Sequence, residues 1–126
     1  MTPFVRVLAA AACLSALASC ITAPPPPGVT YVHASTLSGL VEAGAPQLTP
    51  TDTGTLRAVL PLKNLAKGRL MIEGRATFVG DRGQTVEAPS GWQHVFIEPD
   101  SAAVLQFQSM ASAARQVTIE LREGNR

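Results

Sequence analysis

The fold is decided by a stretch of alternating residues, Leu56-Arg57-Ala58-Val59-Leu60-Pro61-Leu62-Lys63. Successive side chains of an extended strand point to opposite sides, so Leu56, Ala58, Leu60 and Leu62 share one face. This pattern predicts a half-buried strand with those four side chains in the core. Pro61 has no N–H to donate to a neighbouring strand, which predicts that this position lies at a sheet edge or at a bulge.

The same alternation recurs downstream of this stretch. Arg69 to Val79 is predicted to be a strand with Leu70, Ile72, Ala76 and Phe78 on one face. Gly74 in its middle indicates a bulge or a close packing contact. Residues 80–83 (Gly-Asp-Arg-Gly) predict a hairpin turn, because glycine readily adopts positive φ, with Gln84 to Glu87 pairing back. Three later strands are predicted: Trp92 to Ile97, Ala103 to Gln108 with Leu105 and Phe107 inward, and a last one with Val117, Ile119 and Leu121 inward.

The strand from Trp92 to Ile97 has apolar residues on both faces, which predicts burial on both sides. If Trp92 is fully buried, Trp92→Ala is expected to cost about 3 to 5 kcal/mol.

The region before Thr55 is less regular. Val29 to His33 predicts a first strand, whereas residues 37–53 are rich in Gly, Pro, Ser and Thr and predict a loop with one short edge strand. Together the patterns predict an all-β fold, an antiparallel β-sandwich of immunoglobulin-like plan with six to seven strands.

The N-terminus resembles a bacterial lipoprotein signal with the lipobox Leu17-Ala18-Ser19-Cys20. Arg6 supplies the positive charge, and an apolar run of about ten residues follows from Val7 to Ala16. That run is shorter than the about twenty residues of a membrane-spanning helix. We therefore expect residues 1–19 to be a cleaved signal peptide and Cys20 to carry diacylglycerol and an acyl chain such as palmitate. The alternative is an ordinary secretory signal with an incidental cysteine.

Residues 20–28 are predicted to form the acylated cysteine and a semi-rigid spacer, because Pro24 to Pro27 are four consecutive prolines. Residues 29–126 then form the β-sandwich domain, a length that suits a single core. Inner-membrane lipoproteins tend to carry aspartate after the acylated cysteine, where this chain has Ile21. By resemblance to that sorting pattern we expect an outer-membrane lipid anchor on the periplasmic face of the cell envelope.

The balance of charges limits the classes of partner. The full chain has ten Lys and Arg against nine Asp and Glu, and removal of Arg6 with the signal leaves nine of each. A mature domain of zero formal charge has no electrostatic reason to bind nucleic acid. Charged residues make up only 15% of the chain, which is low for a soluble domain and favours tethering or a partner that covers part of the surface.

Candidate catalytic and metal-binding residues are few. His33 and His94 are the only histidines, whereas a zinc site needs three or four ligands, and His94 and Glu98 would lie about 13 Å apart along a strand. Glu73 and Glu87 lie on strands joined by the predicted hairpin, and we interpret them as a solvated cross-strand charge pattern. Neither a Gly-x-Ser-x-Gly elbow nor a phosphate-binding glycine loop is found. We expect no enzyme activity, no cofactor and no metal.

Several features together carry a family resemblance: Leu60-Pro61-Leu62-Lys63-Asn64, then Glu73-Gly74-Arg75-Ala76-Thr77-Phe78 running into Asp81-Arg82-Gly83, then Trp92 with Val95 and Ile97, and last Ala113 through Ile119 to Arg122. With these features the chain from Leu56 to Leu121 resembles the YcfL-like family of small periplasmic lipoproteins, whose molecular function is largely uncharacterised. The resemblance implies a β-sandwich in the envelope and no catalytic residues.

Recognition by a surface or an edge is therefore the expected function. The first hypothesis is a non-enzymatic binding or accessory module for an envelope protein, which offers an edge strand for strand addition. In this hypothesis Pro61 marks one guarded edge, and Val29 to His33 form an open one. The alternative is a carrier of a lipid or small amphiphile in an apolar cleft, which a domain of this size with only six aromatic residues disfavours.

Overall fold

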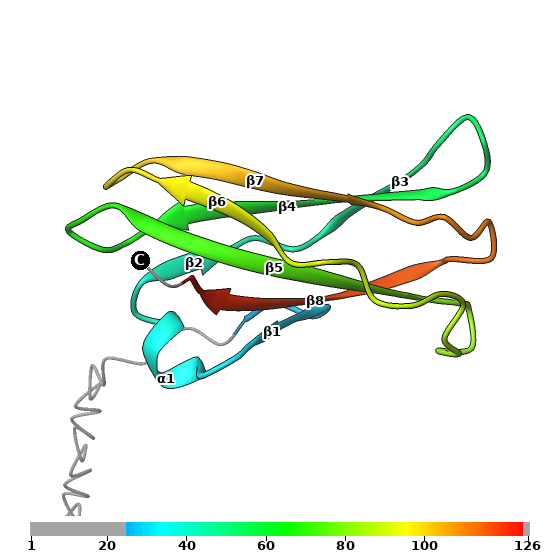
Figure 1. The fold of residues 1–126 in the computed structure, drawn as a ribbon, viewed down its shortest axis with the longest axis horizontal. Helices are drawn as coiled ribbons and strands as arrows, with labels where there is room; N and C mark the ends of the chain where they lie inside the picture. The colour runs from blue at the N-terminus through cyan, green and yellow to red at the C-terminus, as the bar shows by residue number, and fades with distance from the viewer. Residues whose placement is uncertain (1–24, 125–126) are drawn as a thin grey trace, which may run out of the picture.

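The computed structural model describes residues 25–124, which form eight strands and one short helix arranged as two packed sheets (Figure 1). The elements are β1 (Val29–Tyr31), α1 (Ala34–Leu37), β2 (Val41–Ala43), β3 (Gln47–Pro50), β4 (Leu56–Asn64), β5 (Leu70–Val79), β6 (Gln93–Ile97), β7 (Ala102–Gln108) and β8 (Gln116–Glu123). The all-β sandwich prediction is confirmed, with eight strands in place of the expected six to seven.

The first sheet has the strand order β1-β8-β5-β6, and in the second β4 pairs with β2 and β3 on one side and with β7 on the other. The chain crosses between the two sheets at the β1–β2, β4–β5, β6–β7 and β7–β8 connections. Pairing is antiparallel except between β1 and β8, which run parallel. The first strand therefore completes the sheet beside the last one.

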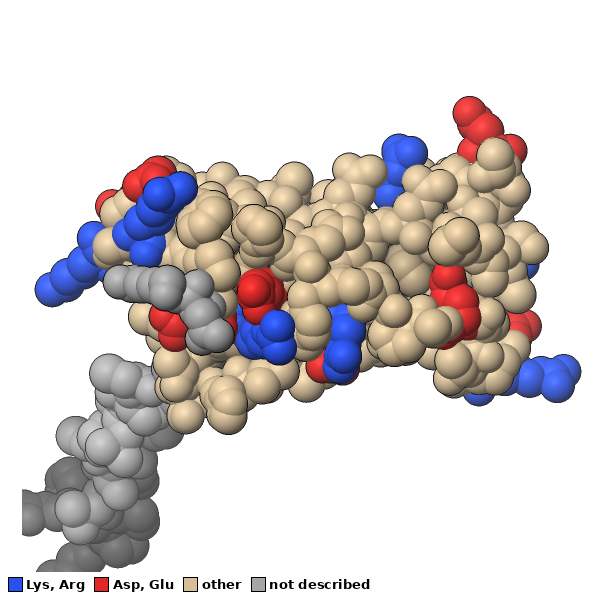
Figure 2. Space-filling view, viewed as in Figure 1, with Lys and Arg blue, Asp and Glu red and all other residues tan. Residues whose placement is uncertain are grey.

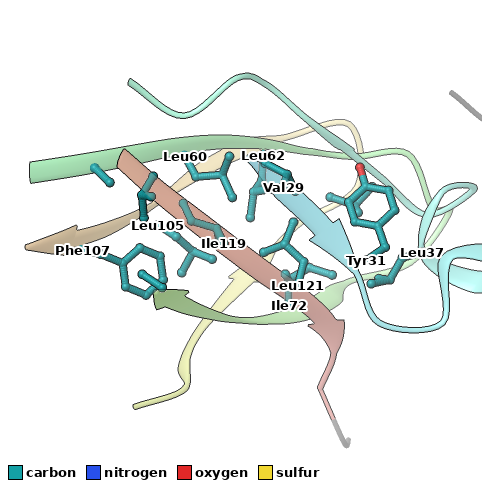
Figure 3. Packing of buried hydrophobic residues seen from close by; sticks show 14 of the residues in the cluster. Val29, Tyr31, Leu37, Leu60, Leu62, Ile72, Leu105, Phe107, Ile119 and Leu121 are labelled. Atoms are coloured by element: carbon teal, nitrogen blue, oxygen red, sulfur yellow. The ribbon is translucent and has the colours of Figure 1, made fainter. Parts of the chain in front are cut away.

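The core lies between the two sheets and is built from the predicted alternation. Leu56, Ala58, Leu60 and Leu62 of β4 are all buried, and so are the inward residues of β5, β7 and β8. Figure 3 shows these side chains in contact from both sheets, with Tyr31 and Leu37 at one end and Phe107 at the other. Burial raises the pKa of the Tyr31 phenol, an effect that the backbone hydrogen bond with Ala43 opposes and Glu42 strengthens.

The region predicted as a loop over residues 37–53 contains more structure than expected. The last residue of the helical turn α1, the buried Leu37, lies here, and the region continues as two strands, β2 and β3, that pair with different parts of β4. The sequence pattern that would indicate these elements is weak, because each of them is only three or four residues long. Periodicity does not identify elements of that length.

Pro61 lies in the central strand β4 and not at an edge. It faces the break between β2 and β3, where Gly44 N donates to Pro61 O at 2.9 Å. The register along β4 shifts by one residue across this break, from Ala43 opposite Leu62 to Gln47 opposite Val59. Pro61, which has no N–H, therefore lies opposite a bulge in the neighbouring strand. A bulge was the second of the two positions that the sequence predicted for it.

Two predictions for residues 84–97 are corrected. The segment Gln84 to Glu87 forms only an isolated bridge between Thr85 and Val79, in place of a paired strand. The strand β6 begins at Gln93 and is an edge strand with Phe96 exposed, so it is not buried on both sides. Trp92 precedes β6 and is half-buried.

The last described residues of the predicted spacer contact the sandwich. Val29 N donates to Pro26 O at 3.1 Å, and Ile119 N donates to Gly28 O at 2.7 Å. Gly28 has a φ of 86°, and its backbone passes close to Val117 O and Pro46. A side chain at this position would be strained, so glycine suits the point at which the chain enters the sheet.

Candidate functional site

The outer side of β7 is an unpaired sheet edge. Hydrogen bonds from Asn64 N to Ser101 O (3.0 Å) and from Ser109 N to Leu56 O (2.8 Å) frame the β4–β7 ladder. Because alternate residues direct their backbone groups to opposite sides, the odd-numbered residues of β7 bond to β4. The even-numbered residues direct N–H and C=O away from β4: Ala102, Val104, Gln106 and Gln108. None of these backbone groups has a hydrogen-bond partner within residues 25–124.

β7 is also the longest edge strand in the described part of the chain. It has seven residues, against three in β1, three in β2, four in β3 and five in β6. Its sequence, AAVLQFQ, contains no charge, no proline and no glycine. Natural edge strands are usually short or carry such residues, since an open edge invites pairing with another chain. β7 pairs with β4 over all seven residues. Its outer edge is therefore long and carries none of the residues that usually block pairing.

The space beside β7 is covered from one side by the other sheet. A Cβ on Gly74 would lie 2.6 Å from Leu105 Cδ1 and 3.4 Å from Phe107 Cζ, so β5 lies over β7. β6 pairs with β5 on the side away from β8, and it lies close to β7 along this margin of the sandwich. Figure 1 shows β6 and β7 along the same side of the sandwich. Three partly buried residues there pack against the core: Val86, Val95 and Ala103.

A cavity of about 350 Å³ lies at the Gln108 end of this edge. It is lined by Phe78, by residues 87–90, and by Gln108 and Met110. Glu87 fixes the loop across this end, since its Oε2 accepts a hydrogen bond from Met110 N at 2.9 Å. The Met110 side chain is 89% exposed, which makes this end of the edge apolar and accessible.

A second surface is formed by Trp92 and two ion pairs on the outer face of the first sheet. The guanidinium carbon of Arg122 lies 3.8 Å from the centre of the Trp92 ring, and that of Arg75 lies 4.8 Å from it. Arg122 pairs with Glu73 at 2.6 Å, and Arg75 pairs with Glu120 at 2.9 Å. Both cations are therefore already neutralised within the protein, and the cluster links β8, β5 and the segment before β6.

Charged side chains are sparse on the face of the molecule drawn in Figure 2. Figure 2 shows Lys, Arg, Asp and Glu in small mixed groups, while most of the visible surface carries neither sign. A surface of this kind gives little long-range steering to a charged ligand.

A larger cavity, of about 490 Å³, lies beside α1. Its lining residues are Val32, His33, Thr36, Leu37, Glu73, Arg122 and Glu123. His33 begins the helical turn with a left-handed φ of 57°, a conformation that few side chains adopt. Three charged side chains line this opening, which does not favour an apolar amphiphile as its occupant.

The structure does not bring the histidines or the predicted carboxylate pair together as a site. His94 lies on β6 opposite Glu73, while His33 lies at the start of α1. Among residues 25–124 no group of three or more His, Cys, Asp or Glu side chains is placed to hold a metal ion. Glu73 and Glu87 have separate partners, Arg122 and the Met110 backbone.

The lipidation residue Cys20, with the whole lipobox, lies outside the described residues. The helical part of residues 25–124 offers no stretch long and apolar enough to span a membrane.

The edge that the sequence predicted to be open is present, but it is shorter than that of β7. The segment expected to be open forms β1, which is an edge strand of only three residues. The strand β7 was predicted, but not its position at an edge. The sequence feature that could have indicated an open edge here is the lack of charged residues in Ala102–Gln108.

No family model matches the chain, and no curated protein does. Among solved structures, the chain is similar to that of cj0090 from Campylobacter jejuni, with a TM-score of 0.61 and 13% identity over 77% of this chain and 98% of that one. It is also similar to a DUF1425 family member from Shewanella sp. pv-4, with a TM-score of 0.60 and 18% identity over 68% and 80% of the two chains. At these identities the likeness shows that the three proteins share a fold.

Proposed function

We propose that this protein is an outer-membrane-anchored lipoprotein of the YcfL-like family, exposed to the periplasm, which acts as a non-enzymatic binding or accessory module for an envelope protein. The observation that carries the proposal is the unpaired edge of β7. An open backbone edge is a binding site in itself, because its donors and acceptors can pair with an extended segment of another chain.

The remaining features agree with recognition of a protein and not with chemistry. The mature chain would have zero formal charge, and Arg75 and Arg122 of the Trp92 cluster each pair with a carboxylate of the same chain. Affinity must therefore come mainly from backbone hydrogen bonds and apolar contacts, which depend weakly on salt. The lipobox supports the anchor, and the spacer that follows it leads directly to β1.

The proposal is tested by recovering the native acylated protein from membranes in mild detergent. Proteins and extracted lipids are then identified by mass spectrometry, with Cys20→Ala as the unanchored control. A stoichiometric envelope protein recovered with the acylated chain is the expected result. Non-covalent lipid recovered without any protein would contradict the proposal and favour the carrier alternative.

A further inference from the structure

We propose that the β7 edge takes up an extended, uncharged segment of the partner protein as an additional strand of the second sheet. This inference rests on the proposed function and specifies its binding site. The added strand would lie beside Ala102–Gln108 in the second sheet, as the next strand after β2/β3, β4 and β7.

The backbone determines that the occupant is a strand. Ala102, Val104, Gln106 and Gln108 present N–H and C=O groups at the alternating spacing of an unfinished ladder. Only another extended backbone matches that spacing over four successive outward residues. A small amphiphile or a helix would leave most of these groups without a protein partner.

The side chains determine the composition of the segment. Residues of the added strand that point inward would meet Ala103, Val95 and Val86, which are partly buried and apolar. A charge at those positions would be buried without a partner among these side chains, so they require apolar residues. Outward residues would lie beside Val104 and Gln106, which favour uncharged side chains. Alternating apolar and uncharged polar residues are therefore expected, with one apolar side chain in the cavity beyond Gln108.

The position of β6 favours a single segment over a second copy of this chain. β6 lies close to β7 at this margin. A second copy paired through its own β7 would bring its own β6 to the same margin, whereas a lone segment carries no second sheet with it.

The test uses the full acylated chain in detergent and a synthetic probe. The probe is a peptide with blocked ends that repeats residues 101–109 of this chain, because β7 itself has the required alternation and an isolated peptide brings no second sheet. Its control carries Leu105→Asp, which places a charge on the inward face. Backbone amide exchange is measured residue by residue with each peptide.

The matched variants are Val104→Pro and Leu48→Pro. The N–H of Val104 faces the proposed strand, and that of Leu48 faces away from β4 on the opposite edge of the same sheet, as the Thr51 N to Thr55 O bond indicates. Neither substitution removes a hydrogen bond within the sheet, so both variants should fold.

The expected result is that the probe slows exchange of the Ala102, Val104, Gln106 and Gln108 amides about tenfold or more. Ala103, Leu105 and Phe107 should be unchanged, since their amides already bond to β4. Val104→Pro and the aspartate peptide should abolish the effect, and Leu48→Pro should retain it.

If the probe protects the β7 amides of Val104→Pro as strongly as those of the unmodified chain, the β7 assignment is overturned. The same holds if no variant shows protection of alternate β7 amides. Dimerisation of the chain with protection of β7 in the absence of probe would replace the partner segment by a second copy. Recovery of an envelope protein equally by Val104→Pro and the unmodified chain would leave the proposed function standing while overturning this site. Protection by the probe without any recovered partner would leave the β7 site standing while overturning the proposed function.

Discussion

At the residue scale, Asn64 is the buried polar side chain on which the β4–β5 turn depends. Its Nδ2 donates to Gly68 O at 2.9 Å and to Ile97 O at 2.8 Å, and its Oδ1 accepts from Ala66 N at 2.7 Å. Asn64→Ala should lower the free energy of unfolding by about 2 to 4 kcal/mol, because buried partners are left unsatisfied. Urea unfolding measures the loss. The exposed neighbour Lys63 supplies the control, and equal effects of Lys63→Ala and Asn64→Ala would contradict the assignment.

Gly74 is a second residue whose identity follows from its contacts. It is buried in the middle of β5, and a Cβ there would meet Leu105 Cδ1 at 2.6 Å and Leu121 Cδ2 at 3.3 Å. Gly74→Ala should destabilise the fold by about 1 to 3 kcal/mol through overpacking. Thermal unfolding of Gly74→Ala with Leu105→Val should show partial recovery. Gly39→Ala is the control, since nothing lies within 4 Å of its Cβ position, and an equal loss there would exclude overpacking as the cause.

At the scale of elements, the contacts of Trp92 with Arg75 and Arg122 hold the start of β6 against the outer face of the first sheet. The half-buried ring stacks on Arg122 and Arg75, so Trp92→Ala should cost about 1 to 2 kcal/mol, less than a fully buried indole. Amide exchange across Gln93–Ile97 should accelerate, while β7 should be less affected. Trp92→Phe keeps an aromatic face and should recover part of the loss. A cost above about 3 kcal/mol would show that the ring acts as a core residue.

The elements that the sequence predicted are those with sustained alternation. β4, β5, β7 and β8 were predicted with the correct inward residues, because a period of two over seven to ten residues fixes both the strand and its face. β2, β3 and α1 are too short to produce such a pattern. Edge position was not predictable either, since whether Pro61 or β7 lies at an edge depends on which strands pair across the sheet.

At the scale of the whole molecule, the order of the strands separates the end where the proposed anchor enters from the proposed binding edge. β1 lies at one margin of the first sheet, beside β8, and β6 lies at the other margin, close to the β7 edge of the second sheet. The spacer enters at β1, where Gly28 O accepts a hydrogen bond from Ile119 N. A partner segment at β7 would therefore bind across the sandwich from the point of attachment, without contact with the spacer.

This separation predicts that anchoring and binding are lost independently. Cys20→Ala should move the protein from the membrane to the soluble fraction, because the acyl chains on that cysteine supply the membrane affinity. Its thermal midpoint and its protection by the β7 probe should not change, since Cys20 precedes the described sandwich. Cys13→Ala is the matched control and should stay in the membrane, because Cys13 belongs to the proposed signal peptide and would be removed with it. If Cys20→Ala remains in the membrane fraction, the lipobox assignment is wrong. If it is released but no longer binds the probe, then the two sides of the sandwich are coupled and the edge does not act alone.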